Sequence, residues 1–332
     1  MYGYPAITQS MAQDMINDFK QLMTGVSAAI LKNLKKEIPV EYHDFIEVCF
    51  ESDIFDNFQS TWKSIQQLKA SDNYIAPQQF KIGEIDDNKT VGNTVVFTKK
   101  SCYGQMIPLR ATLKKFLELP NVFKVVRNFI SNESATNDIG GVYTSLFQGT
   151  IWKNISQIFT GKTVVPLYLY YDDFEINNPL SSAAGIHKVG GLYCSIASLP
   201  PKFASATDNI LLAQLIYNSD YKEFGAERCF AEIKTEFNHL AKKGITIEVD
   251  GENHTIYFVL IGLLGDNLAL NSLLGFNECF ISDYYCRFCR ASKNEARKLT
   301  VENRCLLRTK QNYELDLLDH HYGVKTVVFL MK

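Results

Sequence analysis

Two aspartates stand where apolar, strand-like segments end. Asp266 directly follows the apolar run 255–264 and opens a short amphipathic segment that Gly275 closes. Asp172 follows the apolar run 164–171. Strand-end carboxylates in one domain can bridge Mg²⁺ ions, which activate a water and stabilise a leaving 3′-oxygen in phosphodiester chemistry. The residue types therefore predict a metal site for phosphodiester cleavage, with Asp172 and Asp266 as ligands.

Each of these acids also has a purely structural explanation. Asp173 follows Asp172, and in a regular strand only one of the two faces a given site, because successive side chains alternate. We take Asp172 as the ligand and Asp173 as the fallback, although aspartates also commonly begin turns. Asp266 fits the N-cap of a helix. Residues 170–173 also match the Tyr-x-Asp-Asp string of reverse transcriptases, but the polar residues 177–179 interrupt the second strand that such a hairpin needs.

A Cys-x-x-Cys motif at Cys286 and Cys289 has the ligand spacing of a zinc knuckle. A tetrahedral site needs two further ligands, so the motif is half a Zn²⁺ site; a reduced redox or core pair is the alternative. The candidates for the missing ligands are Cys279, Cys305, His320 and His321. The chain has 8 cysteines scattered along its length, which favours free thiols over a disulfide framework.

The segment that begins at this motif is basic. Residues 286–310 contain eight basic side chains against two acidic ones, a local net charge of +6. Such a run usually forms a solvated helix face, but beside an acidic pocket it also suits a phosphate backbone. The residues that we assign to nucleic-acid binding are Arg287, Arg290, Lys293, Arg297 and Lys298.

The bulk properties bound these expectations. The chain has 332 residues, of which 46% are hydrophobic, enough for a large core and for two domains. Its formal charge of -2 gives no overall attraction to polyanions, so any DNA contact must be local. The first ten residues lack the regions of a signal peptide, and no apolar run approaches ~18 residues. We expect a nuclear or other intracellular protein without membrane contact.

The apolar spacing predicts the elements that must position these residues. In the first half, helices are expected over 10–34, 42–49, 55–68, 108–119 and 122–130, and a hairpin over 80–98 with its turn at 86–89. The polar stretch 131–141 is the expected linker between a mainly helical region, 1–140, and a second domain, 141–332. There, strands are expected over 164–171 and 189–197, helices over 208–217 and 220–243, and a hairpin over 245–264. This pattern predicts a mixed α/β sheet.

Strings around the two aspartates resemble transposase-derived proteins related to CACTA-type (En/Spm-like) DNA transposons. The strings are residues 171–180, 185–188, 193–196, 199–201, Gly265-Asp266, Gly275-Phe276 and Cys286-x-x-Cys289. The resemblance covers roughly residues 164–310 and implies an RNase H-like core that cuts and joins DNA. It further implies an Asp-Asp-Glu/Asp triad holding Mg²⁺ or Mn²⁺, with Asp172 as the first acid and Asp266 as the second.

The sequence departs from that family in two respects. Ser181 replaces the usual glycine, and the third acid expected well past the cysteine pair is missing, because Glu314, Asp316 and Asp319 lack its late-helix setting. We therefore expect a truncated, inactive transposase fragment, which leaves open whether the chain is an enzyme. The alternative is a non-catalytic DNA- or protein-binding module. DNA is the expected partner, and the sequence leaves open whether the chain also forms a homo-oligomer.

Overall fold

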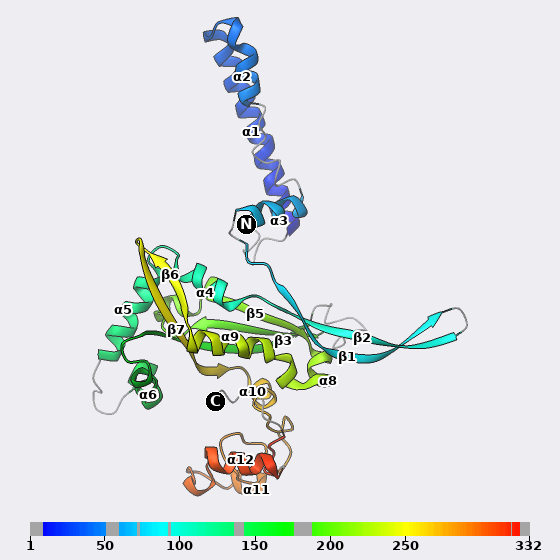
Figure 1. The fold of residues 1–332 in the computed structure, drawn as a ribbon, viewed down its shortest axis with the longest axis vertical. Coiled ribbons are helices and arrows are strands. Elements are labelled where there is room, and N and C mark those ends of the chain that lie inside the picture. Colours follow the sequence, from blue (N-terminus) through cyan, green and yellow to red (C-terminus); the bar gives the residue numbers. More distant parts are fainter. Residues whose placement is uncertain are drawn as a thin grey trace. The chain divides into compact units, whose positions relative to one another are not determined.

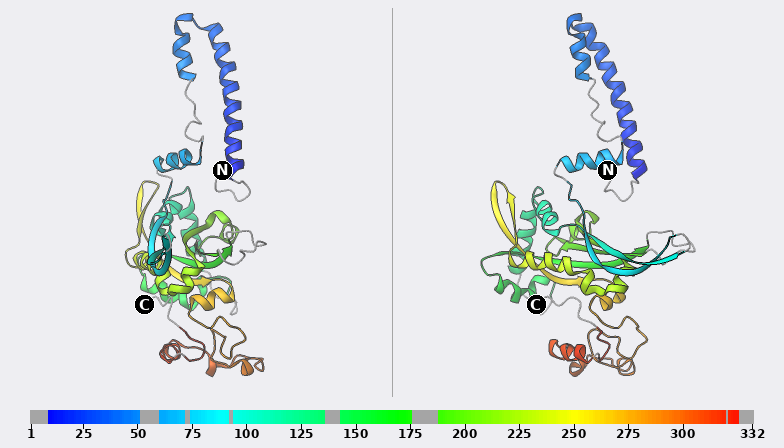
Figure 2. Two further views of the ribbon diagram at one scale, coloured as in Figure 1. Left: turned by 90° about the vertical axis from the view of Figure 1, so that its right-hand side faces the viewer. Right: turned by 45° about the vertical axis from the view of Figure 1, so that its right-hand side comes forward.

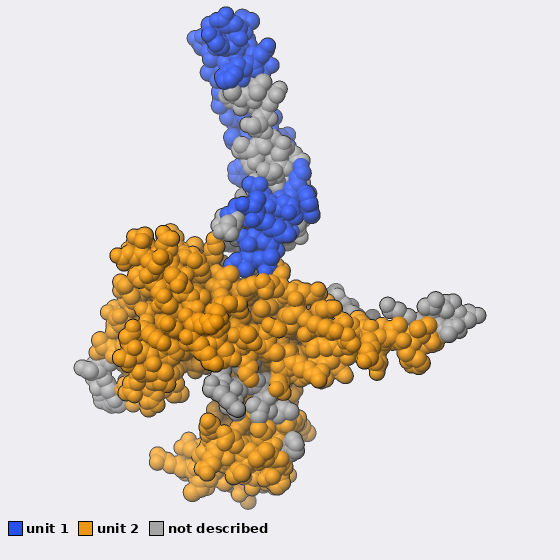
Figure 3. Space-filling view, viewed as in Figure 1, with its two compact units in different colours: residues 1–76 blue, residues 77–332 orange. Residues whose placement is uncertain are grey.

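The computed structural model describes residues 9–50, 60–71, 74–91, 94–135, 143–175, 188–319 and 321–325. The chain divides into two compact units, Met1–Ala76 and Pro77–Lys332 (Figure 3). The boundary predicted near residue 140 falls within 136–142, outside the described residues, and stays a prediction. No helix of the described ranges combines the length and the apolarity needed to cross a membrane.

The first unit is helical, as predicted. Helix α1 (Gln9–Glu37) is followed by a 3₁₀ turn, η1 (Val40–Tyr42), and by α2 (His43–Phe50), which folds back beside the end of α1 (Figure 2). Helix α3 (Thr61–Ala70) begins at Ser60, whose side chain accepts a hydrogen bond from the backbone N–H of Lys63. The start of the helix predicted from residue 55 lies outside the described residues.

The second unit is a mixed α/β structure built on one curled sheet, which in the described ranges has seven strands in the order β1-β2-β5-β4-β3-β7-β6 (Figure 1). All neighbouring strands are antiparallel except β3 and β7, which are parallel. The strands are β1 Gln78–Val91, β2 Thr94–Met106, β3 Thr163–Glu175, β4 Lys188–Ile196, β5 Ile210–Tyr217, β6 Ile245–Val249 and β7 Glu252–Leu264.

Strand β3 lies in the interior of the sheet and carries the first aspartate. Its apolar residues are buried on both sides, and Leu167 is fully enclosed. The strand continues past its predicted end, because Asp172 and Asp173 pair with Gly191 and Gly190 of β4. The prediction that these acids end the strand was therefore wrong, since pairing with β4 overrides the turn preference of Asp.

Two other predictions about the sheet need correction. Residues 208–217 were expected to be helical, but they contain a short 3₁₀ turn, η4 (Thr207–Asn209), followed by strand β5 along β4. The turn predicted at residues 86–89 lies inside β1, where Asp87 pairs with Thr98, and the pairing of β1 with β2 continues to Val91 and Thr94. In both places, cross-strand pairing outweighs local preference.

Helices cover both faces of the sheet. One face packs against α4 (Leu109–Leu117), α5 (Val122–Ala135), α8 (Asn218–Cys229) and α9 (Ala231–Lys242), which share the main apolar core. The helix predicted over 220–243 is broken at Gly225, which has a φ of 73°. On the other face, η3 (Leu146–Gln148) and α6 (Thr150–Ile158) form a smaller core around Trp152.

The chain leaves the sheet through β7. Successive residues of this strand alternate between the two cores, with Ile256 and Phe258 in the main core and Tyr257 and Val259 against the smaller one. After β7 come α10 (Asn267–Leu273), α11 (Lys293–Ala296), η5 (Arg304–Leu306) and α12 (Lys310–Leu318). The predicted hairpin of β6 and β7 and the glycine closure of α9 at Gly244 (φ 68°) are confirmed.

The main core predicts a large difference between two phenylalanines. Phe237 of α9 is 1% exposed, whereas Phe97 of β2 is 82% exposed. We expect Phe237→Ala to lower the free energy of unfolding by about 3–5 kcal/mol, because it removes buried apolar surface and leaves a cavity. Phe97→Ala should cost about 1 kcal/mol or less. Urea unfolding of the two variants measures the difference, and equal costs would contradict this core.

Candidate functional site

The parallel pairing of β3 and β7 brings the two predicted metal ligands together. Their last paired residues are Tyr170 and Leu264, and Asp172 and Asp266 stand two positions further along each chain. Neighbouring strands lie about 4.8 Å apart, and the carboxyl ends of parallel strands open on the same edge of a sheet. Two acids 94 positions apart in the sequence therefore become neighbours.

A glycine lets the chain pass close to β3 between β7 and α10. A Cβ placed on Gly265 would lie 3.3 Å from the backbone oxygen of Tyr171 and 3.4 Å from the Cβ of Ala269. These contacts are tight, so a side chain here would push β7 away from β3. Gly265 therefore keeps Asp266 close to the end of β3.

Asp172, Asp173 and Asp266 line one cleft of about 630 Å³. Other polar residues on its walls come from β4, α8, α10 and the loop after α10, and they are Lys188, Asn218, Tyr221, Lys222, Ser272 and Glu278. The cleft thus combines carboxylates with two ammonium groups. Such a lining suits a ligand that carries both a cation and an anion.

The two adjacent aspartates have partners on different elements, as alternation along a strand predicts. Tyr170 donates a hydrogen bond from its hydroxyl to Oδ2 of Asp172, at 3.0 Å. Asn218 donates to Oδ2 of Asp173 at 2.9 Å, and Nζ of Lys188 lies 3.7 Å from the same oxygen. Asp173 is therefore held by α8 and β4, while Asp172 is bound by a tyrosine of its own strand.

Asp266 is the N-cap of α10, as its sequence context predicts. Its Oδ1 accepts a hydrogen bond of 2.6 Å from the backbone N–H of Ala269. A carboxylate offers about four lone-pair positions on two oxygens. The cap uses one of them, so the structural role and a metal-binding role are compatible.

The acidic residues of the cleft raise the pKa of two nearby tyrosines. The hydrogen bond to Asp172 raises the pKa of Tyr170, and burial and the charges of Asp172 and Asp266 raise it further. Burial raises the pKa of Tyr221 to about 12, and the charge of Glu278 contributes. The charges of both predicted ligands therefore act on Tyr170. The charge of Glu278, an acid that the sequence analysis did not single out, acts on Tyr221. Glu278 lies in a loop, where no periodicity could have drawn attention to it.

The described His, Cys, Asp and Glu side chains include no group of three close enough to hold a metal ion. The cleft therefore brings Asp172 and Asp266 together without a third ligand at the same point. Asp316, one of the three late acids, is not part of this cleft. Glu314 and Asp319 are exposed on α12 and at its end.

The cysteine pair lies in a small ladder of backbone hydrogen bonds. Phe288 donates its backbone N–H to Sγ of Cys286 at 3.4 Å, and Arg308 donates its own to the carbonyl of Phe288 at 2.9 Å. Burial raises the pKa of the Cys289 thiol, to which Cys286 contributes. The other ligand candidates that can be placed, Cys279, Cys305 and His321, are exposed, and His320 lies outside the described residues.

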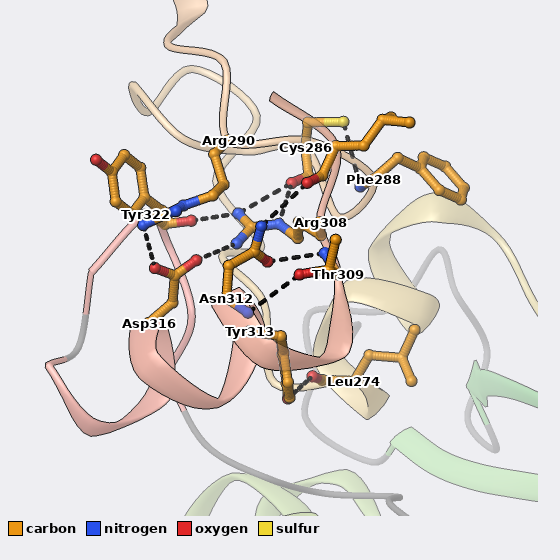
Figure 4. A network of polar contacts seen from close by, with 11 residues as sticks. Leu274, Cys286, Phe288, Arg290, Arg308, Thr309, Asn312, Tyr313, Asp316 and Tyr322 are labelled. Carbon is orange, nitrogen blue, oxygen red and sulfur yellow. Dashed lines mark hydrogen bonds and ion pairs between the residues drawn. The ribbon is translucent and has the colours of Figure 1, made fainter. Parts of the chain in front are cut away.

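A buried ion-pair network holds this region together (Figure 4). Asp316 of α12, only 2% exposed, accepts hydrogen bonds from Arg290 at 2.7 Å and from Arg308 at 3.0 Å. Arg308 also donates to the carbonyl of Cys286 at 3.2 Å. Asp316 therefore balances one buried guanidinium group, that of Arg308, and one partly buried group, that of Arg290, instead of completing an acidic triad.

The five predicted nucleic-acid contacts have different surroundings. Arg290 is bonded to Asp316, and its guanidinium carbon lies 4.0 Å from the ring centre of Tyr322. Lys293 donates to the carbonyl of Ile281 at 2.9 Å. Arg297 and Lys298 are exposed at the end of α11. The basic run is thus partly structural, and its solvent-facing charge is smaller than the sequence indicates.

Arg287 links the segment that contains Cys286 and Cys289 to the start of α10, next to the acidic cleft. It donates to Oδ1 of Asn267 at 2.9 Å, and Asn267 directly follows Asp266. Asn271, which is 1% exposed, donates to the carbonyls of Asn277 at 2.7 Å and Tyr285 at 3.2 Å. Buried amides with such partners fix one geometry. Helix α10 is therefore tied both to the strand-end acids and to the cysteine-containing segment.

The fold and the cleft define a mixed α/β protein with an acidic cleft just beyond the point where the parallel pairing of β3 and β7 ends. In comparisons with known proteins, the chain matches no protein-family model and has no significant match among curated proteins.

The network around Asp316 gives a testable prediction. Asp316→Asn should destabilise the C-terminal region by about 3 kcal/mol or more, because it leaves the buried charge of Arg308 and the partly buried charge of Arg290 uncompensated. Asp319→Asn is the matched control, since that side chain is exposed. Hydrogen exchange of the amides of Arg290 and Arg308 measures the effect. Unchanged protection in the Asp316 variant would contradict the network.

Proposed function

We propose that the chain is a transposase-derived protein with an RNase H-like core. Its ancestral chemistry is the metal-dependent cleavage and strand transfer of DNA phosphodiester bonds, and its expected location is the nucleus. The observation that carries the proposal is that Asp172 and Asp266, each two residues beyond the last paired residues of β3 and β7, line one cleft. The family resemblance would give these two aspartates the roles of first and second acid.

The donor atoms suit a hard divalent cation. Mg²⁺ and Mn²⁺ prefer carboxylate oxygens and usually keep several waters, which an open cleft can accommodate. Asp172 and Asp266 would hold the ion, and Tyr170 orients Asp172 through its hydrogen bond. When bound, such an ion would activate a water and stabilise the leaving oxygen. For Zn²⁺ at Cys286 and Cys289, two ligands still have to be supplied.

The cleft also offers contacts for the phosphate backbone. Lys188 and Lys222 lie on its wall beside the acids. Lysines that neutralise phosphates release counterions, which supplies sequence-independent affinity. Arg297 and Lys298 add exposed positive charge in the same unit. These residues support DNA as the partner.

A second candidate function is a DNA-binding module without catalysis. The observation that favours it is that the described carboxylates do not form a set of three around one point. Glu278 lines the cleft but lies beyond α10, near Tyr221. A protein of this kind would keep the basic wall of the cleft and lose the chemistry.

Asparagine substitutions test the metal site without removing structure. Asn caps helices about as well as Asp, so Asp266→Asn should keep α10, and the amide oxygen introduced by Asp172→Asn can still accept the bond from Tyr170. We expect each substitution to weaken Mn²⁺ binding at least about tenfold, the effect seen even for residues that only orient a ligand. Asp208→Asn, on the exposed turn η4, is the control.

Two readouts on the full chain then separate the candidates. Mn²⁺ affinity by calorimetry tests the site, and Mg²⁺-dependent nicking of supercoiled plasmid tests the chemistry. Nicking that is abolished in both variants supports a transposase-like enzyme, and Mn²⁺ or DNA binding without nicking supports the inactive module. Mn²⁺ binding that both variants retain would show that these acids form no metal site.

The two lysines give an independent prediction for DNA affinity. In EDTA, Lys188→Gln combined with Lys222→Gln should reduce the slope of log K against log salt by about 0.9 for each phosphate that is no longer neutralised. Lys153→Gln, on the exposed surface of α6, should leave the slope unchanged. Fluorescence anisotropy with a duplex at several salt concentrations measures both. An identical slope in the double variant would show that Lys188 and Lys222 do not contact the DNA.

A further inference from the structure

The N-terminal unit lacks a hydrophobic core among its described residues. Of the described side chains of residues 13–76, only Ser64 is buried. Helix α1 is 29 residues long, and its end pairs with α2 through an ion pair between Lys35 and Glu47. Isolated helices are marginal in water, and most helical stability comes from packing an apolar face. The unit therefore needs a partner surface.

An apolar stripe on α1 marks where that partner would bind. Phe19, Leu22, Met23, Val26 and Ile30 follow the spacing of one helical face. They are 48%, 61%, 41%, 44% and 45% exposed, so α2 does not cover them. Five large apolar side chains in one row exceed the scattered exposure that is normal for a monomer.

The charges beside this stripe identify the occupant. Asp14 and Asp18 lie in the first half of α1, and Lys32 and Lys36 lie in the second half, all four exposed. At about 100° per residue, these positions fall within roughly 40° of one another, on one flank of the stripe. Two copies of α1 in antiparallel orientation would place each acidic pair against a basic pair. A parallel pair would not bring these charges together, because in it each flank of the stripe faces the opposite flank of the second copy.

The centre of the pattern is Gly25, which lies midway between Asp18 and Lys32 and between Asp14 and Lys36. A Cβ placed on Gly25 would meet nothing within 4 Å, so the surface here is open. The apolar pairs Phe19 with Ile30 and Met23 with Val26 are centred half a residue before Gly25, so an antiparallel pair that crosses near this point would also bring them together. The apolar side chains would then contact each other, and the acidic pairs would lie against the basic pairs, in the same arrangement.

From these features we infer that α1 is a self-association surface, on which a second copy of the chain packs its own α1 antiparallel, crossing near Gly25. The inference rests on the first unit alone and does not depend on the proposed DNA chemistry. It commits to one partner, a second copy, because the charge pattern of α1 is complementary to itself.

The first test removes the apolar stripe from the full chain. Analytical ultracentrifugation should show a dimer for the unmodified chain at concentrations up to about 100 μM. Met23→Glu combined with Val26→Glu should give a monomer. Val40→Glu is the control, because Val40 is 80% exposed but lies on η1, away from the stripe. A monomeric unmodified chain at all these concentrations would overturn the inference.

The second test fixes the orientation. The variants D14K/D18K and K32E/K36E should each weaken self-association on the order of tenfold or more, because each brings like charges together. Mixing the two variants should restore a heterodimer, because one copy then carries only basic and the other only acidic side chains at these four positions, and these flanks face each other only in the antiparallel arrangement. Circular dichroism confirms that each variant keeps its helix. Mixed variants that stay monomeric would overturn the antiparallel dimer.

Discussion

The site depends on one constraint, the parallel pairing of β3 with β7. A parallel pair cannot be joined by a tight turn, so the chain has to leave β3, form β4 and β5, cross through α8 and α9, and return. Everything between the two strands serves that return, and the main core fills the space beneath it. Because both strands run in the same direction, whatever follows them meets at one edge. An acidic residue near the end of each strand is then sufficient to form the cleft.

The region beyond α10 shows how a buried charge network changes the meaning of a basic sequence. Eight basic residues in 286–310 indicate an exposed patch, but Asp316 draws Arg290 and Arg308 inward. Burying these charges is tolerable because both are paired with Asp316 and because Arg308 also donates to the carbonyl of Cys286. The network therefore gives this small, core-poor segment a defined shape, whether or not Zn²⁺ binds there.

The sequence predicts an element well where local interactions determine its structure, and poorly where pairing with another strand determines it. The apolar runs located β3 and β7, and local chemistry identified the N-cap at Asp266. Local preference failed for β5, for the acidic residues inside β1 and for Asp172 within β3, because each is held by pairing with a neighbouring strand of the sheet. Glu278 could not be predicted at all, since its place in the cleft depends on how a loop folds near Tyr221.

Asp266 caps a helix and, in the proposed function, would also hold a cation, and this combination has an evolutionary consequence. Its hydrogen bond to Ala269 needs only a side-chain oxygen, which asparagine also supplies, whereas holding a cation needs the negative charge. A single-nucleotide change from Asp to Asn could therefore silence the chemistry while the fold persists. Once selection on catalysis is relaxed, such a chain would still be made, fold and resist degradation. A folded product without its original activity is then available for recruitment to another role.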